Sequence, residues 1–206
     1  KALVLDEKDI DNLKSIFNFN FDLKKIDFSS KNKFSFYLNK NLQTDKIKLS
    51  SKINIEEASF LNNTNLKKIF PEIKDEIILK NNEINFDYQE NFFLIKGSGN
   101  ISIQKSKDFI SYKLEKKKDL LFFDNSLKIK DGPFLLDFLN FKKDLGKETI
   151  IEIVGNKKKD NQLLLNSITI KEDNNNIRIK NLVIDKNKIV NDFDSINLDY
   201  LDKDNQ

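Results

Sequence analysis

Residues 92–104 read FFLIKGSGNISIQ, and apolar and polar side chains alternate along this stretch with a period of two. Phe93, Ile95, Ile101 and Ile103 have the same parity, and the two glycines of the GSG motif share it. Successive side chains of a strand point to opposite faces, so the pattern predicts one strand that passes straight through GSG. Glycine inside a strand marks a bend, a bulge or the close approach of another body. A kink that curves the sheet and clearance for a ligand are both compatible with it.

The same alternation restarts every dozen or so residues from residue 42 to the end of the chain. It is carried by KINIEEASF, EINFDYQ, DFISYKLEK, LFFDNSLKIK, TIIEIVG, LLLNSITI, NIRIKNLVI and SINLDYL. Many strands in series, each with one apolar and one polar face, predict a mainly β fold. We expect a long curled antiparallel sheet, an open β-groove or half-pipe of repeated strands, with one or two short helices. Residues 1–41 form a poorly defined N-terminal segment, with a short helix predicted over residues 5–20.

Two segments interrupt the strand pattern. Residues 63–73 predict a loop with one or two turns of helix. Residues 131–146, DGPFLLDFLNFKKDLG, have Asp131 as a cap, Pro133 at an early helical position and Gly146 as a terminator, and they predict a helix near 133–142. This helix is apolar over most of its circumference, so it must be covered. We expect it to plug the apolar face of the sheet; facing a membrane or a partner is the alternative. Its apolar residues are Phe134, Leu135, Phe138, Leu139 and Phe141.

An internal repeat is visible near the C-terminal end. Residues 165–170, 179–184 and 193–198 align at a fixed spacing, and each set has a small polar residue (Ser167, Asn181, Ser195) before two aliphatic positions. The first apolar residue of each set has the opposite parity to the last two, which predicts a β-bulge or bend at the polar residue. The connecting DNNN and DKNK segments are typical of turns.

Composition excludes several classes of function. The chain has 36 Lys and Arg against 33 Asp and Glu, no His and no Cys. Arg178 is the single arginine, and no basic block suits nucleic acid. Without His and Cys, nucleophilic triads and zinc sites lack their usual residues, so we expect no enzyme activity, no metal and no cofactor. The lysine triplets 116–118 and 157–159 read as turns, with contact to anionic head groups as the alternative.

A sheet that is apolar on one side must pack on a second sheet, on helices or on a ligand. A closed barrel or β-sandwich would hide this face internally. The alternative is an open half-pipe whose lining is left for acyl chains, and a dozen strands about 4.8 Å apart would make it about 55 Å long. Gly97 and Gly99 would give clearance in such a groove. The predicted groove-lining residues are Ile84, Phe86, Phe93, Ile95, Gly97, Gly99, Ile101, Ile103, Tyr112, Leu114, Ile151, Ile153, Ile168, Ile170, Leu182, Ile184, Ile196 and Leu198.

The order and rhythm of these blocks carry a resemblance to a known family. INFDYQENFFLIKGSGNISI, then FISYKLEKKK, then PFLLDFLNF, then the repeated strands from IIEIVG to SINLDYL resemble the AsmA-like superfamily, in particular the YhdP-type and TamB-type envelope proteins. The resemblance covers residues 42–206 and rests on no invariant motif. It implies a segment of a periplasm-spanning β-groove that shields acyl chains and supports phospholipid transport between the inner and outer membranes of bacteria.

The resemblance also implies location and partners. It places the chain on the periplasmic side of the cell envelope, anchored to the inner membrane through a segment not present here; Lys1 in place of Met indicates a mature form or an excised segment. The expected partners are phospholipid acyl chains, the membrane through that anchor and other envelope proteins, and no nucleic acid. For a functional lining, Ile101→Asp or Ile170→Asp would impair lipid occupancy more than Lys105→Asp. The alternative function is a self-contained secreted or surface β-sandwich or solenoid that binds a protein or glycan.

Overall fold

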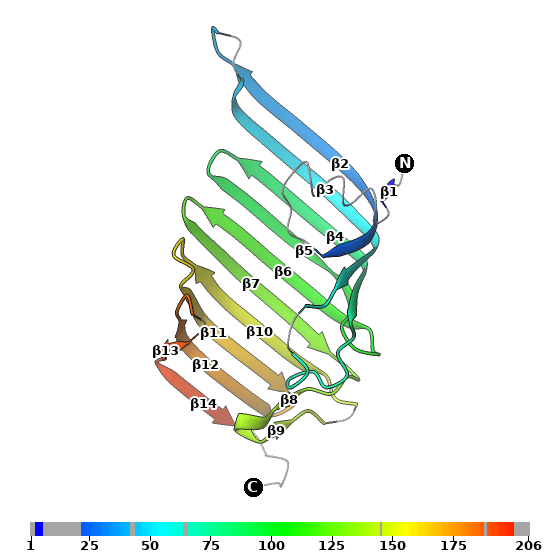
Figure 1. Cartoon of the computed structure of the whole chain (residues 1–206), viewed down its shortest axis with the longest axis vertical. Coiled ribbons are helices and arrows are strands. Elements are labelled where there is room, and N and C mark those ends of the chain that lie inside the picture. Colours follow the sequence, from blue (N-terminus) through cyan, green and yellow to red (C-terminus); the bar gives the residue numbers. More distant parts are fainter. Residues whose placement is uncertain are drawn as a thin grey trace.

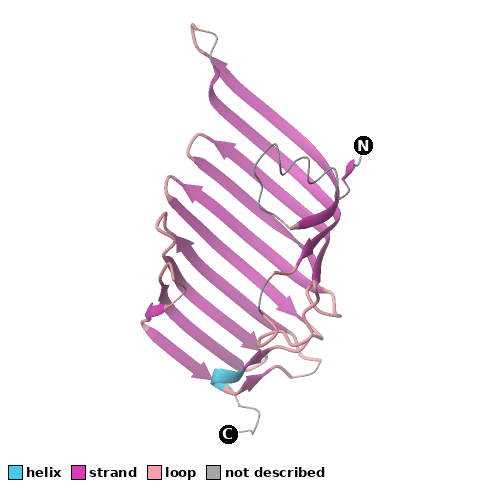
Figure 2. Ribbon diagram, in the orientation of Figure 1, coloured by secondary structure: helices cyan, strands magenta, loops and turns pink. Residues whose placement is uncertain are grey.

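The structure, a computed structural model, describes residues 3–5, 22–41, 44–63, 66–144, 146–187 and 189–199. Its main body is one open antiparallel sheet of 12 strands, as the alternating sequence pattern predicted (Figures 1 and 2). A second sheet has two very short strands. The strands are β1 (Leu3–Leu5), β2 (Leu23–Leu38), β3 (Thr44–Leu61), β4 (Glu76–Gln89), β5 (Phe92–Ser102), β6 (Asp108–Lys117), β7 (Leu120–Ile129), β8 (Leu135–Leu136), β9 (Phe141–Lys142), β10 (Thr149–Lys157), β11 (Leu163–Glu172), β12 (Asn175–Ile184), β13 (Val190–Asp192) and β14 (Ser195–Asp199).

The strands follow one another across the main sheet almost in chain order. The order is β1-β2-β3-β4-β5-β6-β7-β10-β11-β12-β13, and β14 pairs with β12 beside β13. The segment between β7 and β10, which holds β8 and β9, leaves the main sheet. Short hairpin turns keep neighbouring strands together; Asn91, Lys118 and Asp173 have positive φ angles of 58°, 54° and 48° in three of these turns. Because each strand contacts only its neighbours, the sheet has two ends and does not close.

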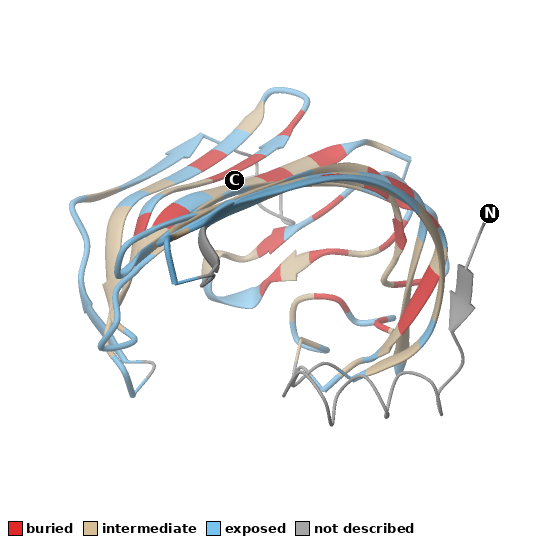
Figure 3. Cartoon of the chain, turned by 90° about the horizontal axis from the view of Figure 1, so that it is seen from above, coloured by how far each residue is buried: buried red, intermediate tan, exposed pale blue. Residues whose placement is uncertain are grey.

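Viewed along its longest axis, the sheet has the shape of an arch, because its strands bend (Figure 3). Register shifts that introduce bulges lie in β2–β3, β4–β5 and β10–β11, and a bulge bends a strand and increases its twist. The prediction of a straight strand through GSG is confirmed, since β5 runs from Phe92 to Ser102 without interruption. The curvature gives the sheet one concave and one convex face.

Two loops lie under the concave face and cover one end of it (Figure 3). We call residues 66–73 and 132–143 the covering loops. Their buried residues Phe70, Ile73, Phe134, Leu136 and Phe141 form one hydrophobic core with the sheet residues Ile129, Ile151, Ile170 and Ile177. This core is the structural reason that the lean apolar content of the chain suffices: it is concentrated at one end of the strands.

The prediction of a helix near 133–142 is wrong for most of that range. A single 3-10 turn, Asp137–Leu139, lies between the two short strands β8 and β9. Asn140 ends the turn in the left-handed region, with φ of 54°, and its N–H donates to the Asp137 carbonyl. The chain therefore reverses here instead of continuing as a helix. Residues 67–73, predicted to include helical turns, form turns and a bend and no helix.

The division of the chain at residue 42 is not seen in the sheet. β2 pairs with β3 from Leu23 to Leu38 and belongs to the same sheet as the later strands. The register between β2 and β3 shifts three times, and such shifts interrupt the period-two alternation in this part of the sequence. The short helix predicted over residues 5–20 lies outside the described residues apart from Leu5, which is in β1.

The predicted irregularity in the C-terminal repeat is confirmed for two of its three sets. The register of β10 and β11 shifts between Val154 and Gly155, opposite Ser167 and Leu165. Asn181 has a left-handed φ of 52°. Ser195, the polar residue of the third set, is the first residue of β14. The DNNN and DKNK segments contain the turns that join β11 to β12 and follow β12.

Candidate functional site

The concave face is built from rows of directly paired side chains that run across the strands. One row passes from Ile53 to Ile84, Gly97 and Tyr112, then through Asn125 to Ile153, Ile168, Ile179 and Ile196. Directly opposite residues of an antiparallel pair lie on the same face of the sheet. This row therefore shows which of the alternating residues in each strand point to the concave face. The nine strands from β3 to β14 that the row crosses span eight steps of about 4.8 Å, so the row is about 38 Å long.

The register places the predicted lining residues of the strands on this one face. Phe86, Ile95 and Leu114 form a parallel row that continues to Phe123 and ends, beyond Gly155, at Leu165 and Leu182. Towards the covered end, Ile151 pairs with Ile170, and Ile177 joins Ile170 to Leu198. At the opposite end, Phe93 lies in a row that ends at Ile184. Ile101 lies at the other end of β5 from Phe93, where it pairs with Leu79 and with Asp108. Ile103 alone follows the end of its strand and packs against the core.

Several concave residues were not predicted although their parity indicates them. Ile110 has the parity of Tyr112 and Leu114, and the alternation of β7 includes Phe123 and Leu127. Ile177, which is 1 % exposed, follows from its pairing with Ile170. The covering residues Leu66, Ile69, Phe70 and Ile73 carry no such signal, because a loop has no periodicity from which its contacts can be read.

The covering loops fill the end of the groove near the β5–β6 and β7–β10 connections. The Phe134 ring lies between those of Phe70 and Phe141, with centroid distances of 5.5 Å and 6.2 Å. The Leu135 N–H donates to the Ile69 carbonyl at 3.0 Å and joins the two loops. The predicted seating of this segment against the sheet is thus observed for Phe134 and Phe141, with Leu139 packed beside them, whereas Phe138 is 73 % exposed.

Buried polar side chains fasten the covering loops to the sheet. Gln104, 1 % exposed, accepts from the Glu72 N–H and donates to the Pro133 carbonyl, so it holds both loops. The Lys143 ammonium donates to the carbonyls of Lys130 and Asp144 at 2.8 and 2.9 Å. Each of these groups replaces water with backbone partners, which is the condition for burying it without a large penalty.

The same end of the groove holds two buried carboxyl groups. Glu172, 1 % exposed, accepts from the Thr149 hydroxyl at 2.5 Å and from the Asp144 N–H at 3.1 Å. Asp108 accepts from the Ser106 hydroxyl, and its second oxygen has no partner among the described residues. Burial raises the pKa of Asp108 above its ordinary value. These two buried carboxyl groups thus lie at the covered end of the groove.

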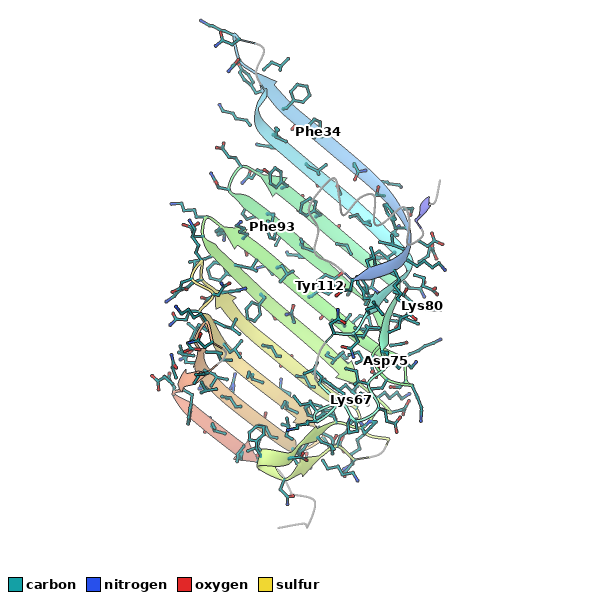
Figure 4. The ribbon with its side chains drawn as sticks, viewed as in Figure 1. Phe34, Lys67, Asp75, Lys80, Phe93 and Tyr112 are labelled. Carbon is teal, nitrogen blue, oxygen red and sulfur yellow. The ribbon has the colours of Figure 1, made fainter. Side chains whose placement is uncertain are left out.

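Between the covering loops and the sheet lies a cavity of about 350 Å³ whose exposed wall is entirely apolar. Ile69, Phe70 and Phe134 line it from the loops, and Ile153 and Ile168 line it from the sheet. Pockets of this size and lining are typical of sites for apolar ligands. We call the part of the concave face that the covering loops do not reach the open half of the groove. Figure 4 places Phe34 and Phe93 there, on the sheet and far from Lys67 and Asp75.

The two glycines of GSG do not leave space for a ligand. A Cβ atom at Gly97 would lie 2.5 Å from the Tyr112 ring, which therefore crosses this position. A Cβ atom at Gly99 would lie 2.5 Å from Cγ of Asn82 and 2.6 Å from the Asn81 carbonyl. Asn81, with φ of 51°, forms a bulge in β4, and the Asn82 amide donates to the Lys80 and Asn100 carbonyls. The glycines are needed for the close approach of neighbouring protein atoms.

Three of the predicted lining residues, Ile101, Ile151 and Ile170, are core residues. Ile101 and Ile170 are 8 % and 5 % exposed, and Ile170 lies in the cluster beneath the covering loops. An aspartate at either position would bury an unpaired carboxylate and destabilise the fold. A test of ligand binding therefore belongs in the open half of the groove, where Phe93, Ile95 and Leu114 are half-buried.

The lysine triplets meet at the rim of the open half. On the concave face Leu121 pairs with Lys116 on one side and with Lys157 on the other. The Lys159 ammonium lies 3.7 Å from the Asp119 carboxylate, which links the two hairpin tips. Two solvent-exposed ammonium groups thus flank an apolar residue at the mouth of the groove.

Other kinds of site are absent from the described part of the chain. No group of three or more carboxylates or other ligating side chains there could hold a metal ion. Within the same residues no helix has the length and apolar character needed to cross a membrane. Comparisons with protein-family models, with curated proteins and with solved structures find no match to this chain.

Proposed function

We propose that this chain is a segment of a lipid-conducting β-groove, which shields acyl chains along its concave face. The observation that carries the proposal is the run of paired, mainly apolar residues across nine strands. The covering loops pack on one end of the strands and leave the rest of this face without cover from the described residues. A contiguous apolar surface of this extent on a folded protein marks a site of interaction. Neighbouring strands contribute similar side chains, so a chain bound along the groove meets a similar surface at each step.

The dimensions and charge of the groove suit an amphipathic ligand. Each methylene group that leaves water for the apolar face contributes about 0.8 kcal/mol, so an acyl chain gains enough to bind along a few strands. At the mouth, Lys116 and Lys157 beside Leu121 can contact an anionic head group that stays in water. The ligand class proposed is therefore phospholipid, with its acyl chains on the concave face.

The wider biological role rests on the resemblance of the sequence to the AsmA-like superfamily. In this role the groove supports phospholipid transport between the inner and outer membranes, on the periplasmic side of a bacterial envelope. The chain itself acts as a conduit, without catalysis or a cofactor. The open sheet does not have the two packed sheets of a β-sandwich. Binding of a protein or glycan is the competing function.

The test exploits adjacent phenylalanines on opposite faces of the same strands. Phe93 and Phe123 lie in concave rows, whereas Phe92 and Phe122 point to the convex face. We would purify the wild type, Phe93→Asp/Phe123→Asp and Phe92→Asp/Phe122→Asp without strong detergent. Native mass spectrometry with lipid extraction would then measure bound phospholipid, and thermal melts would verify folding.

We expect phospholipid to co-purify with the wild type and with the convex variant, and its occupancy to fall about tenfold or more in the concave variant. A carboxylate beside an acyl chain costs more than the 1.4 kcal/mol that corresponds to this factor. Equal loss in both folded variants, or a lipid-free wild type that also extracts no labelled lipid from phosphatidylethanolamine–phosphatidylglycerol vesicles, would refute the proposal.

A further inference from the structure

The main sheet has two edges whose backbone groups face no other strand in the described part of the chain. At the first edge, β1 pairs only with Ile26–Phe28 of β2, so Ser29–Leu38 forms a free edge. At the other edge, β14 pairs with β12 on one side only. Free edges of this kind are templates for the addition of a further strand.

The directions of the two edge strands are compatible with each other. Every neighbouring pair from β2 through β7, β10, β11 and β12 to β14 is antiparallel, and there are nine such steps. An odd number of reversals makes β14 run opposite to β2. A second copy moved along the sheet without being turned over therefore presents its β2 antiparallel to β14, with both concave faces on the same side.

The two edges also carry opposite charge. Residues 29–38 contain Lys31 and Lys33 and no acidic residue, whereas residues 190–199 contain Asp192, Asp194 and Asp199 and no basic residue. Pairing two β2 edges would place lysines together, and pairing two β14 edges would place aspartates together. The β2-to-β14 contact is the edge pairing that joins opposite charges.

Both edges expose apolar side chains on the concave side. Phe34 and Phe36, with ring centroids 5.5 Å apart, are 60 % and 48 % exposed on β2. Ile196 and Leu198, which pair with the concave residues Ile179 and Ile177, are 40 % and 49 % exposed on β14. An antiparallel register with Asp199 opposite Lys33 sets Leu198 opposite Phe34 and Ile196 opposite Phe36.

We propose that β14 of one copy of this chain pairs with the free edge of β2 of a second copy in that register. The contact is head-to-tail, so an assembly of any length keeps one free β2 edge at one end and one free β14 edge at the other, and it grows without closing. The concave faces of successive copies become one longer apolar surface. The proposal does not depend on what the groove binds.

The test is sedimentation velocity over a concentration series up to about 1 mM, the weak limit of specific association. We expect the average mass of the wild type to rise above the 24.2 kDa of one chain and to pass the dimer without a plateau. Lys31→Glu/Lys33→Glu is expected to lower the association constant at least tenfold, and Asp192→Lys/Asp199→Lys to do the same. Mixing the two variants restores association, because each then meets an edge of opposite charge.

Lys96→Glu/Lys118→Glu is the matched control, since both lysines are exposed and lie away from the edges. This variant changes the net charge as Lys31→Glu/Lys33→Glu does and is expected to associate as the wild type does. A wild type that stays monomeric up to the highest concentration, a mass that stops at a dimer, or mixed edge variants that remain apart would each overturn the proposal. All three variants alter solvent-exposed side chains, so they are expected to keep the fold.

Discussion

Replacement of Phe134 by alanine tests the role of the covering loops. Phe134 is 2 % exposed, and its ring contacts those of Phe70 and Phe141. Truncation of a buried phenylalanine costs about 3–5 kcal/mol. Phe134 also lines the 350 Å³ cavity, so neighbouring side chains have space to relax and we expect the lower end of this range, about 3 kcal/mol. With a urea m-value of about 2–3 kcal/mol/M, the unfolding midpoint falls by about 1 M.

Phe138→Ala is the control for this experiment, because Phe138 belongs to the same loop and is 73 % exposed. Its expected effect on the free energy of unfolding is within about 0.5 kcal/mol. Hydrogen exchange should also show faster opening at the Leu135 and Lys143 amides, which bond to Ile69 and Phe134 carbonyls. Equal midpoints for the two variants, or a loss below about 1 kcal/mol for Phe134→Ala, would refute the assignment of this loop to the core.

Two further predictions concern the glycines and the buried acid. Gly99→Ala is expected to lower the free energy of unfolding in urea by about 1–3 kcal/mol, because the new methyl group meets the bulged backbone beside Asn82. Gly97→Ala is expected to lower it less, since the Tyr112 ring can move aside. A larger loss for Gly97→Ala than for Gly99→Ala would contradict this reasoning. Burial raises the pKa of Asp108 above its ordinary value of 3.8, so the folded state binds a proton more tightly than the unfolded chain. The free energy of unfolding therefore falls as pH rises from the pKa of the unfolded chain to the raised pKa of the folded state. Asp108→Asn removes this penalty: its melting temperature relative to wild type should be higher at about pH 7 than at about pH 4, and a pH-independent difference would contradict the assignment.

The strand content and the parity of the faces could be predicted because both are local properties. The alternation Phe93, Ile95, Gly97 fixes one face of β5 from neighbouring residues alone, and the structure keeps this alternation. Where a bulge interrupts the alternation, as at Asn81 in β4, the local pattern no longer indicates the partner. The need for glycine at Gly99 in β5 arises from that bulge in the neighbouring strand β4, so the sequence of β5 alone does not indicate it.

What the sequence by itself determined is a series of half-apolar strands, because a period of two commits each strand to one apolar face. Only the tertiary structure decided what covers that face. Residues 131–146 are apolar enough for a helix, yet Phe134 packs between Phe70 and Phe141, and Gln104 bonds to both covering loops. Such contacts join segments distant in sequence, and their free energy outweighs the local helical preference of a short segment.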